Sequence, residues 1–347
     1  MVPPRVGSII LPLDARRGRS LTNKYLITGG AGFIGSHLAD VLTANFGCEV
    51  VALDNLSTGR QANLVPLVDR DSFRFVRGSI FDEELVRKLV GDVDVVVHLA
   101  ASVGVQLIVK RPLETLLNNI RGTEIVLEVC ADESRKVLVA STSEIYGKNA
   151  SGPLHEDADR ILGSPLKSRW SYSTSKAVDE ILAHAYWRER QTPAVIVRLF
   201  NTVGPRQTGD YGMVVPRLVG QALRGEPLSV FGTGEQRRSF CHVLDTVAAL
   251  VALLNEDAAV GEVFNIGSPA EITINDLART IVEMTGSPSP IEHVPYDVAY
   301  EVGFEDMERR VPDISKISAL TGWMPTRSLP QILEDVIEFE RASRADR

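Results

Sequence analysis

A glycine-rich turn near the N-terminus constrains the fold more than any other feature of the sequence. Gly29, Gly32 and Gly35 follow an apolar stretch predicted as a strand, Lys24–Thr28, and open a predicted helix at Gly35–Asn45. Glycines at these positions let the backbone turn tightly and approach a pyrophosphate, while the helix N-terminus offers unpaired N–H groups and the positive end of its dipole. Strand, turn and helix together predict a dinucleotide site rather than a bare turn.

An acidic residue at the end of the next strand supports this prediction. Asp54 directly follows the predicted strand Glu49–Leu53 and lies 19 positions after Gly35. A carboxylate there can accept hydrogen bonds from both ribose hydroxyls and repels a 2′-phosphate, so NAD is favoured over NADP. The nearby Arg60 is interpreted as a solvated loop residue.

Short apolar strands alternate with helices through the first two-thirds of the chain. Further strands are predicted at Phe73–Val76, Val93–Leu99, Lys136–Ala140 and Pro193–Leu199, with helices at Pro112–Cys130 and Ser173–Glu189. This alternation is typical of a parallel sheet covered on both faces. We therefore expect an α/β fold with a doubly wound parallel (Rossmann) sheet, whose ligands bind at the carboxyl ends of the strands.

The pattern loosens after Asn201, where glycine and proline become frequent. We expect an N-terminal extension at residues 1–20 and an NAD-binding domain at 21–200. Residues 201–347 are expected to form mainly a smaller α/β lid that binds substrate, with some segments returning to the first domain. Leu329–Arg341 is predicted to be a closing amphipathic helix.

The bulk properties exclude several other classes of protein. A formal net charge of -8 disfavours nucleic acid as a partner. Cys48, Cys130 and Cys241 have neither disulfide nor zinc spacing, and no metal site is expected. No apolar run approaches the roughly 18 residues needed to span a membrane, and the patch Ile9–Leu13 is too short for a signal peptide. A cytoplasmic protein with no membrane partner is expected.

Several motifs together resemble the extended short-chain dehydrogenase/reductases, in the branch that acts on nucleotide sugars. The resemblance runs over nearly the whole chain from Lys24 and includes the segments 54–59, 98–101, 119–123, 142–147, 172–176 and 201–206. It implies a homodimer packed through helices and NAD contacts from Phe33, Ile34, Asn55, Ser57, Thr58, Gly59, Ser79, Ile80, Leu99, Ala100, Ala101, Asn119, Tyr172 and Lys176. Ser79 and Ile80 would flank the adenine, although the family often has Asp in place of this serine.

Tyr172 and Lys176 are the candidate catalytic pair. Their spacing of four places them on one face of a predicted helix. A tyrosine has a pKa near ~10, and the positive charges of Lys176 and the oxidised nicotinamide are expected to lower it. Tyr172 would then take a proton from a sugar hydroxyl, oriented by Thr142, while hydride leaves the same carbon.

The second half supplies candidate substrate contacts. Arg238 and Arg310 come from separate segments and can clamp a diphosphate through charge-assisted hydrogen bonds. In the enzymes that the chain resembles, these positions and Asn201 hold the nucleotide diphosphate, and the residue at Phe231 stacks on uracil. A UDP-sugar is the substrate that this resemblance implies.

The triplet Thr142-Ser143-Glu144 bears on the reaction. The family oxidises its sugar at C4, and the 4-keto sugar is then epimerised, dehydrated or decarboxylated. Ser143 stands where a dehydratase would need an acid, so elimination is disfavoured. The triplet resembles UDP-glucuronate decarboxylases, and also GDP-mannose dehydratases, whose glycine loop and cofactor preference differ. Ser143 is expected to orient the sugar, and Glu144 to position a water or hydroxyl that protonates C5.

We therefore expect NAD-dependent decarboxylation of UDP-glucuronic acid to UDP-xylose, to UDP-4-keto-xylose, or to both. The alternative is a UDP-sugar 4-epimerase acting on UDP-glucose or UDP-glucuronate, since the segment 102–105 lacks the proline and tyrosine usual in the decarboxylases. A non-catalytic NAD-binding regulator is a further alternative. It is disfavoured because Thr142, Tyr172 and Lys176 are all present.

Overall fold

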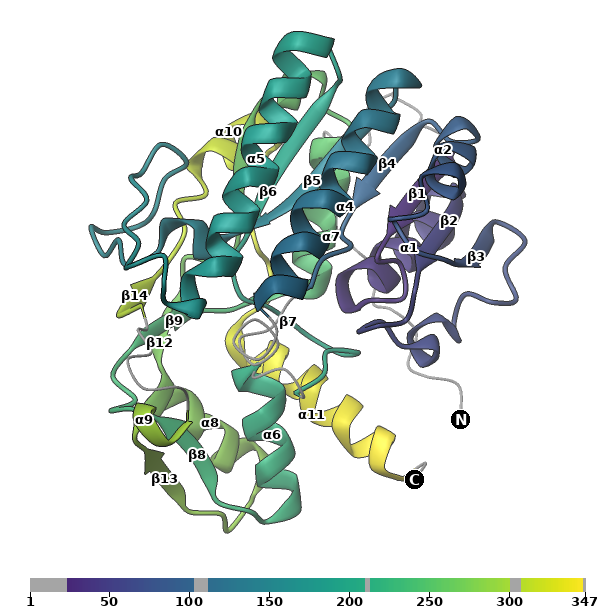
Figure 1. Ribbon diagram of the computed structural model, residues 1–347. Helices are drawn as coiled ribbons and strands as arrows, with labels where there is room; N and C mark the ends of the chain where they lie inside the picture. The colour runs from purple at the N-terminus through teal and green to yellow at the C-terminus, as the bar shows by residue number, and fades with distance from the viewer. Residues whose placement is uncertain (1–23, 103–111, 210–212, 300–306, 346–347) are drawn as a thin grey trace.

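The computed structural model describes residues 24–102, 112–209, 213–299 and 307–345. The expected extension at residues 1–20, and all of the segment 102–105 except Ser102, lie outside the described residues. The main sheet has seven strands in the order β11-β6-β5-β4-β1-β2-β3, and all of its pairings are parallel (Figure 1). In chain order the strands are β1 (Lys24–Thr28), β2 (Glu49–Asp54), β3 (Phe73–Arg77), β4 (Val95–His98), β5 (Lys136–Thr142), β6 (Ala194–Leu199) and β11 (Val263–Ile266).

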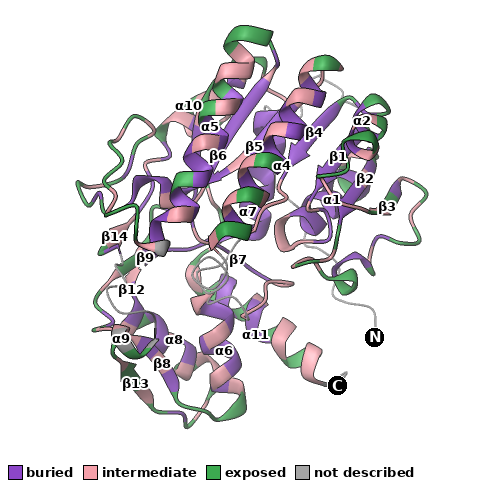
Figure 2. Ribbon diagram, in the orientation of Figure 1, coloured by how far each residue is buried: buried purple, intermediate pink, exposed green. Residues whose placement is uncertain are grey.

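Alternate residues of these strands face opposite sides of the sheet, and both sides are covered. Ile27 packs with residues of α1, α7 and α10 on one side, whereas its neighbour Leu26 packs with α2, α4 and α5 on the other. The strands are accordingly buried along most of their length (Figure 2). The covering helices are α1 (Phe33–Phe46), α2 (Glu83–Gly91), α4 (Pro112–Asp132), α5 (Ser171–Arg190), α7 (Val243–Leu254) and α10 (Ser315–Thr321). The predicted doubly wound architecture is confirmed.

A smaller lobe lies below the sheet in Figure 1. Its core is formed by α6 (Val214–Arg224), α8 (Ile274–Thr285) and α11 (Leu329–Ala345), which pack around β8 (Leu228–Phe231). The predicted closing helix is therefore present and extends to Ala345. Short strands link this lobe to the sheet: β7 (Thr202–Val203), β9 (Arg237–Ser239), β10 (Cys241–His242), β12 (Glu271–Thr273), β13 (Ile291–Val294) and β14 (Arg309–Arg310). The remaining helices are η2 (Gln61–Leu64), η3 (Ser143–Tyr146), η4 (Ser168–Trp170), η5 (Asp257–Ala259) and α9 (Tyr296–Ala299).

The elements of the sheet half that escaped the sequence prediction include α2 and β11. The helix α2 is short, and the side chain of its N-cap, Asp82, accepts a hydrogen bond from the backbone N–H of Leu85. The strand β11 follows residue 201 yet pairs with β6 as the edge strand of the main sheet. A boundary between domains at residue 200 stays a prediction. In the part of the chain that the structure describes, no helix combines the length and the apolar character needed to cross a membrane.

Candidate active site

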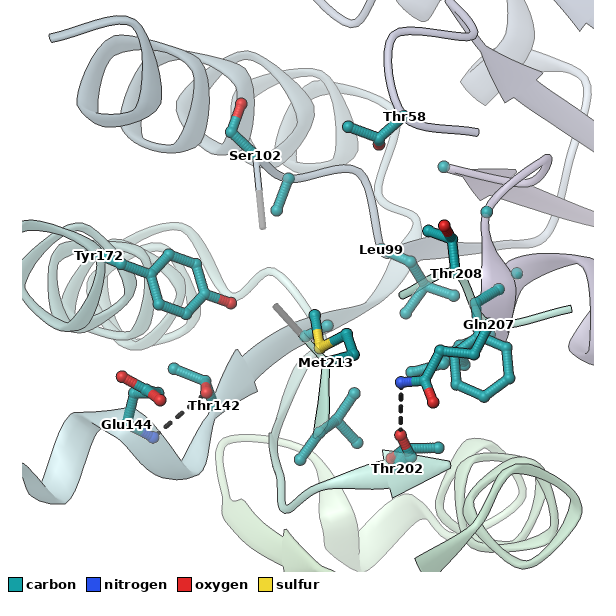
Figure 3. Close-up of a pocket in the computed structure, with 18 of the residues that line it drawn as sticks. Thr58, Leu99, Ser102, Thr142, Glu144, Tyr172, Thr202, Gln207, Thr208 and Met213 are labelled. Atoms are coloured by element: carbon teal, nitrogen blue, oxygen red, sulfur yellow. Dashed lines mark hydrogen bonds between the residues drawn. The ribbon is translucent and has the colours of Figure 1, made fainter. Parts of the chain in front are cut away.

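A cavity of about 520 Å³ lies between the carboxyl ends of the strands and the smaller lobe. The glycine turn lines one end, and the strand end at Thr142 and the arginines of the smaller lobe line the other. Figure 3 shows this space, into which the phenol of Tyr172 points. The predicted site residues that line it are Gly29, Gly32, Phe33, Ile34, Gly35, Asp54, Asn55, Ser57, Thr58, Ile80, Leu99, Ala100, Ala101, Thr142, Ser143, Glu144, Tyr172, Lys176, Asn201, Phe231, Arg238 and Arg310.

The glycine turn has the geometry of an anion-binding loop. Gly29 has a φ of 72°, in the left-handed region that favours glycine. A Cβ on Gly29 would lie 2.9 Å from the backbone nitrogen of Ala100, so no side chain fits between the turn and the end of β4. Helix α1 begins at Phe33, and its N-cap, Gly32, provides no side-chain cap. Its first N–H groups can therefore serve a pyrophosphate, and these residues fit NAD.

Asp54 ends β2 and is held by backbone amides alone. Its Oδ2 accepts a hydrogen bond from the N–H of Ala31 at 3.0 Å, and its Oδ1 accepts one from the N–H of Leu56 at 2.8 Å. Each oxygen can accept a second bond, such as one from a ribose hydroxyl. Burial raises the pKa of this carboxyl, although the two amides oppose the shift.

Three predicted NAD-binding residues do not line the cavity. Gly59 lies against Asp54, where a Cβ would come 2.7 Å from Oδ2. The hydroxyl of Ser79 accepts a hydrogen bond from the N–H of Phe81 at 3.2 Å. Asn119 accepts one from the N–H of Ser102 at 2.8 Å and donates one to Ser175 at 3.1 Å. Asn119 thus ties α4 to α5, the helix that carries Tyr172 and Lys176.

Tyr172 and Lys176 share the buried face of α5, but the protein does not pair them as expected. The Nζ of Lys176 donates to the carbonyl of Ala140 and to Oδ2 of Asp179, both at 2.9 Å. Burial raises the pKa of Tyr172, as do the negative charges of Glu144 and Asp179. A hydrogen bond with Thr142 opposes this rise. Burial is the largest cause of this rise, and the lowering expected from Lys176 and the oxidised nicotinamide stays a prediction.

Glu144 lies two residues after Thr142, in η3, between two arginines. Its Oε1 accepts a hydrogen bond from Nη1 of Arg310 at 2.6 Å, and its Oε2 accepts one from Nη1 of Arg169. Burial alone would raise the pKa of Glu144, but the two guanidinium groups outweigh it and hold the pKa at about 2. Glu144 is therefore ionised at any working pH, and two guanidinium groups share its carboxylate.

Arg169, which precedes Tyr172 by three positions in η4, was not predicted as a site residue. A single arginine in a polar loop carries no signal of its own, and only the packing of α5 against η3 brings it to Glu144. Arg310 was predicted to hold a diphosphate. The structure places it against Glu144 and against Oδ1 of Asn201, and next to Arg238 across the pairing of β14 with β9. A contact between Arg310 and the diphosphate stays a prediction.

The far end of the cavity is lined by Phe231. The guanidinium of Arg217 lies over its ring, 4.0 Å from the centroid, so one face of the ring is covered. Arg217, Gln236 and Tyr296 also line this end, and the sequence analysis named none of them. Among the described residues, no group of three or more His, Cys, Asp or Glu side chains is arranged to hold a metal ion.

Comparison with known proteins agrees with this geometry. Residues 25–267 match the family described as "NAD dependent epimerase/dehydratase family". The chain is 39% identical over 327 residues to the UDP-N-acetyl-alpha-D-glucosaminuronate decarboxylase of Bacillus cytotoxicus, covering 94% of this chain and 100% of that protein. It is 34% identical to UDP-glucuronic acid decarboxylase 1 of Xenopus tropicalis, covering 97% of this chain and 80% of that protein.

A solved structure is similar over the same extent. It is the UDP-glucuronic acid 4-epimerase of Bacillus cereus in complex with UDP-glucuronic acid and NAD. The two chains superpose with a TM-score of 0.84 at 34% identity, covering 92% of this chain and 99% of that one.

Proposed function

Because the chain belongs to the NAD-dependent epimerase/dehydratase family, we propose that it decarboxylates a UDP-linked hexuronic acid with NAD as cofactor. The observation that carries this proposal is the pair of arginines at Glu144. Arg169 and Arg310 share its carboxylate, and all three side chains line the cavity that holds Tyr172. The two guanidinium groups would attract a second carboxylate, at C6 of the sugar, more strongly than a C6 hydroxyl.

The reaction requires a ketone β to that carboxylate. Tyr172 takes the proton of the C4 hydroxyl, and Thr142 orients the same oxygen. Bound NAD would supply the hydride acceptor for this oxidation at C4. If the hydride returns after decarboxylation, the product is UDP-xylose; otherwise it is UDP-4-keto-xylose. The C5–C6 bond then breaks, its electron pair moves toward the ketone oxygen, and carbon dioxide leaves.

C5 must afterwards gain a proton, and Glu144 cannot be its source. The pKa of Glu144 is about 2, so its carboxyl carries no proton to donate. As a carboxylate it can accept a hydrogen bond from a water or hydroxyl that delivers the proton to C5. Ser143, which is buried beside it and lines the cavity, is placed to orient the sugar.

Two hexuronates are candidate substrates. UDP-glucuronic acid was expected from the sequence, and the name of the Xenopus relative supports it. The name of the Bacillus cytotoxicus relative supports a sugar with a 2-acetamido group. The test is incubation with UDP-glucuronic acid, UDP-N-acetylglucosaminuronic acid and UDP-glucose, read by mass spectrometry. Loss of carbon dioxide from either uronate supports the proposal. Unchanged mass with both would contradict it.

A 4-epimerase is the second candidate, supported by the similar Bacillus cereus structure. Such an enzyme would convert UDP-glucuronic acid to UDP-galacturonic acid without loss of mass. Chromatographic separation of the two uronates in the same incubation distinguishes the candidates.

We further propose a cytoplasmic homodimer. The three cysteines are free and buried, which suits a reducing compartment. Leu117 on α4 and Ile181 on α5 are apolar but 58% and 65% exposed, and the two helices pack side by side. Together they offer an apolar face to a second copy. Sedimentation of the wild type and of Ile181→Glu tests this, with a dimer expected for the former and a monomer for the latter.

A further inference from the structure

A buried carboxylate next to the catalytic lysine has no part in the mechanism above. Asp179 lies on α5, three residues after Lys176, and is completely inaccessible to solvent. Its Oδ2 accepts a hydrogen bond from the Nζ of Lys176 at 2.9 Å. The same nitrogen donates to the carbonyl of Ala140 at 2.9 Å. An ammonium has three N–H donors, so these two partners leave one for the cavity that Lys176 lines.

A chain of hydrogen bonds leads from the first strands to Thr123. His98 at the end of β4 bonds Thr28 through Nδ1 at 2.8 Å and Thr123 through Nε2 at 3.1 Å. Burial raises the pKa of Asp179, and Lys176 and the hydroxyl of Thr123 oppose that rise. Burial lowers the pKa of His98 to about 3, aided by the charge of Lys176, so the imidazole is neutral. It then has one donor nitrogen and one acceptor nitrogen.

The direction of the bonds in this chain depends on the hydroxyl of Thr123. With that hydroxyl turned toward the negative charge of Asp179, Thr123 accepts a hydrogen bond from Nε2 of His98. Nδ1 of His98 then accepts from the hydroxyl of Thr28, whose oxygen accepts from the N–H of Ala100 at 3.3 Å. Ala100 lines the cavity, so this chain runs from the wall of the cofactor site to Thr123.

We propose that Asp179 is a positioning residue that holds the ammonium of Lys176 against Ala140, turns its third N–H toward the cofactor ribose, and offsets its charge beside Tyr172. The ribose contact rests on the proposed NAD-dependent function, whereas the charge compensation rests on the ion pair alone. Without Asp179, the ammonium would be free to rotate away from the cavity, and its full charge would act on the phenol.

The charged groups around Tyr172 allow the direction of the effect to be worked out. Glu144 approaches it from η3, Arg310 from β14, and Lys176 with Asp179 from its own helix. Glu144 and Asp179 raise the pKa of Tyr172, and Arg310 lowers it. Neutralising Asp179 therefore lowers the pKa of Tyr172, so that the phenolate becomes available at lower pH.

Two substitutions separate the two roles of Asp179. Asp179→Asn keeps an acceptor oxygen for Lys176 but removes the charge. NAD affinity, measured by calorimetry, should stay within about twofold of wild type, and the rising limb of single-turnover NADH formation should move to lower pH by roughly one unit. Asp179→Leu removes the acceptor as well, and should weaken NAD binding by roughly tenfold because Lys176 is no longer oriented.

The matched control is Glu180→Gln, which neutralises the adjacent buried carboxylate. Glu180 pairs with Arg198 and Ser141 rather than with Lys176. Its variant should keep the wild-type pH profile even if it is less stable. Unchanged NAD affinity in Asp179→Leu overturns the positioning role, and an unshifted pH limb in Asp179→Asn overturns the charge role. If Asp179→Leu does not fold, the pH limb of Asp179→Asn still tests the charge role. If the enzyme oxidises no sugar, the NAD affinity of Asp179→Leu still tests the positioning role, independently of the proposed reaction.

Discussion

Two buried carboxylates stand at opposite ends of the cavity, and the protein treats them in opposite ways. Asp54 is held by backbone N–H groups, with no arginine or lysine bonded to it, so burial raises its pKa. Glu144 is held by Arg169 and Arg310, which outweigh burial and keep its pKa at about 2. The first end suits neutral hydroxyl donors such as those of a ribose. The second holds two guanidinium groups and suits an anionic group.

The partners of the two carboxylates also differ in sequence distance. Those of Asp54 are 23 and 2 residues away, within or just after one strand-helix-strand segment. Those of Glu144 are 25 and 166 residues away, in η4 and β14. One end of the site is thus a local structure, while the other exists only through tertiary packing. Each prediction below tests whether the two ends act independently.

Replacing Tyr172, which lines the cavity between the two ends, should have the largest effect on activity. Tyr172→Phe removes the oxygen that takes the C4 proton, so NADH formation should fall by roughly 10²–10⁴-fold. NAD binding and thermal stability should stay near wild type, because the substitution removes only the hydroxyl and keeps the aromatic ring. Single-turnover absorbance of NADH measures the rate. Near-normal NADH formation would remove Tyr172 from the mechanism.

At the arginine-bound end, Glu144→Gln should slow carbon dioxide release by roughly 10–100-fold, in the range of a misplaced reacting group. NADH formation should slow less, because hydride transfer relies on Tyr172. The control is Glu271→Gln, which neutralises a carboxylate paired with Arg309 outside the cavity. Equal slowing of both steps in Glu144→Gln would mean that the two ends are not separable.

At the amide-bound end, Asp54→Ser should weaken NAD binding by about tenfold or more through loss of charged acceptors for the ribose. It should also reduce the preference of NAD over NADP, since a carboxylate repels a 2′-phosphate. Calorimetric titration of both cofactors into the wild type and the variant provides the measurement. Wild-type protein that binds NADP more tightly than NAD would show that Asp54 does not face the ribose.

The smallest effect concerns stability at acid pH, and its sign should differ between the two ends. The folded-state pKa of Glu144, about 2, lies below its ordinary value of 4.5. Its stabilisation is therefore present above pH 4.5 and is lost as the pH falls toward 2. The pKa of Asp54 is raised, so ionisation there costs stability, and acidification relieves that cost.

These signs are tested by melting temperatures of the wild type, Glu144→Gln and Asp54→Asn between pH 7 and roughly pH 3, the range over which carboxyl groups titrate. The excess of the wild-type melting temperature over that of Glu144→Gln should shrink on acidification. The wild-type melting temperature should rise relative to that of Asp54→Asn. If both differences in melting temperature change in the same direction on acidification, the two carboxylates do not differ as described.

The same difference explains what the sequence could predict. The strands, the catalytic helix and the cofactor end were predictable because their signals are local: apolar runs, a glycine turn, and residues at fixed short spacings. Arg169, Arg217 and the pairing of Lys176 with Asp179 were not. A lone arginine has the same local signal whether it is solvated or buried against a glutamate. The role of Asp179 depends on Ala140 of β5 as well as on its own helix, so the strand and the helix must both be placed before it can be interpreted.

The distance from Glu144 to Arg310 has a consequence for how the protein is made. A growing chain completes β1, the glycine turn and β2 early in synthesis, whereas Arg310 emerges near its end. Closing a loop of 166 residues rather than 23 costs about 2 kcal/mol more in chain entropy. A nascent chain therefore exposes Glu144 with only its nearer arginine available until the last segments leave the ribosome. If synthesis stops before residue 310, the protein has the glycine turn at the cofactor end of the cavity but lacks Arg310 at the Glu144 end.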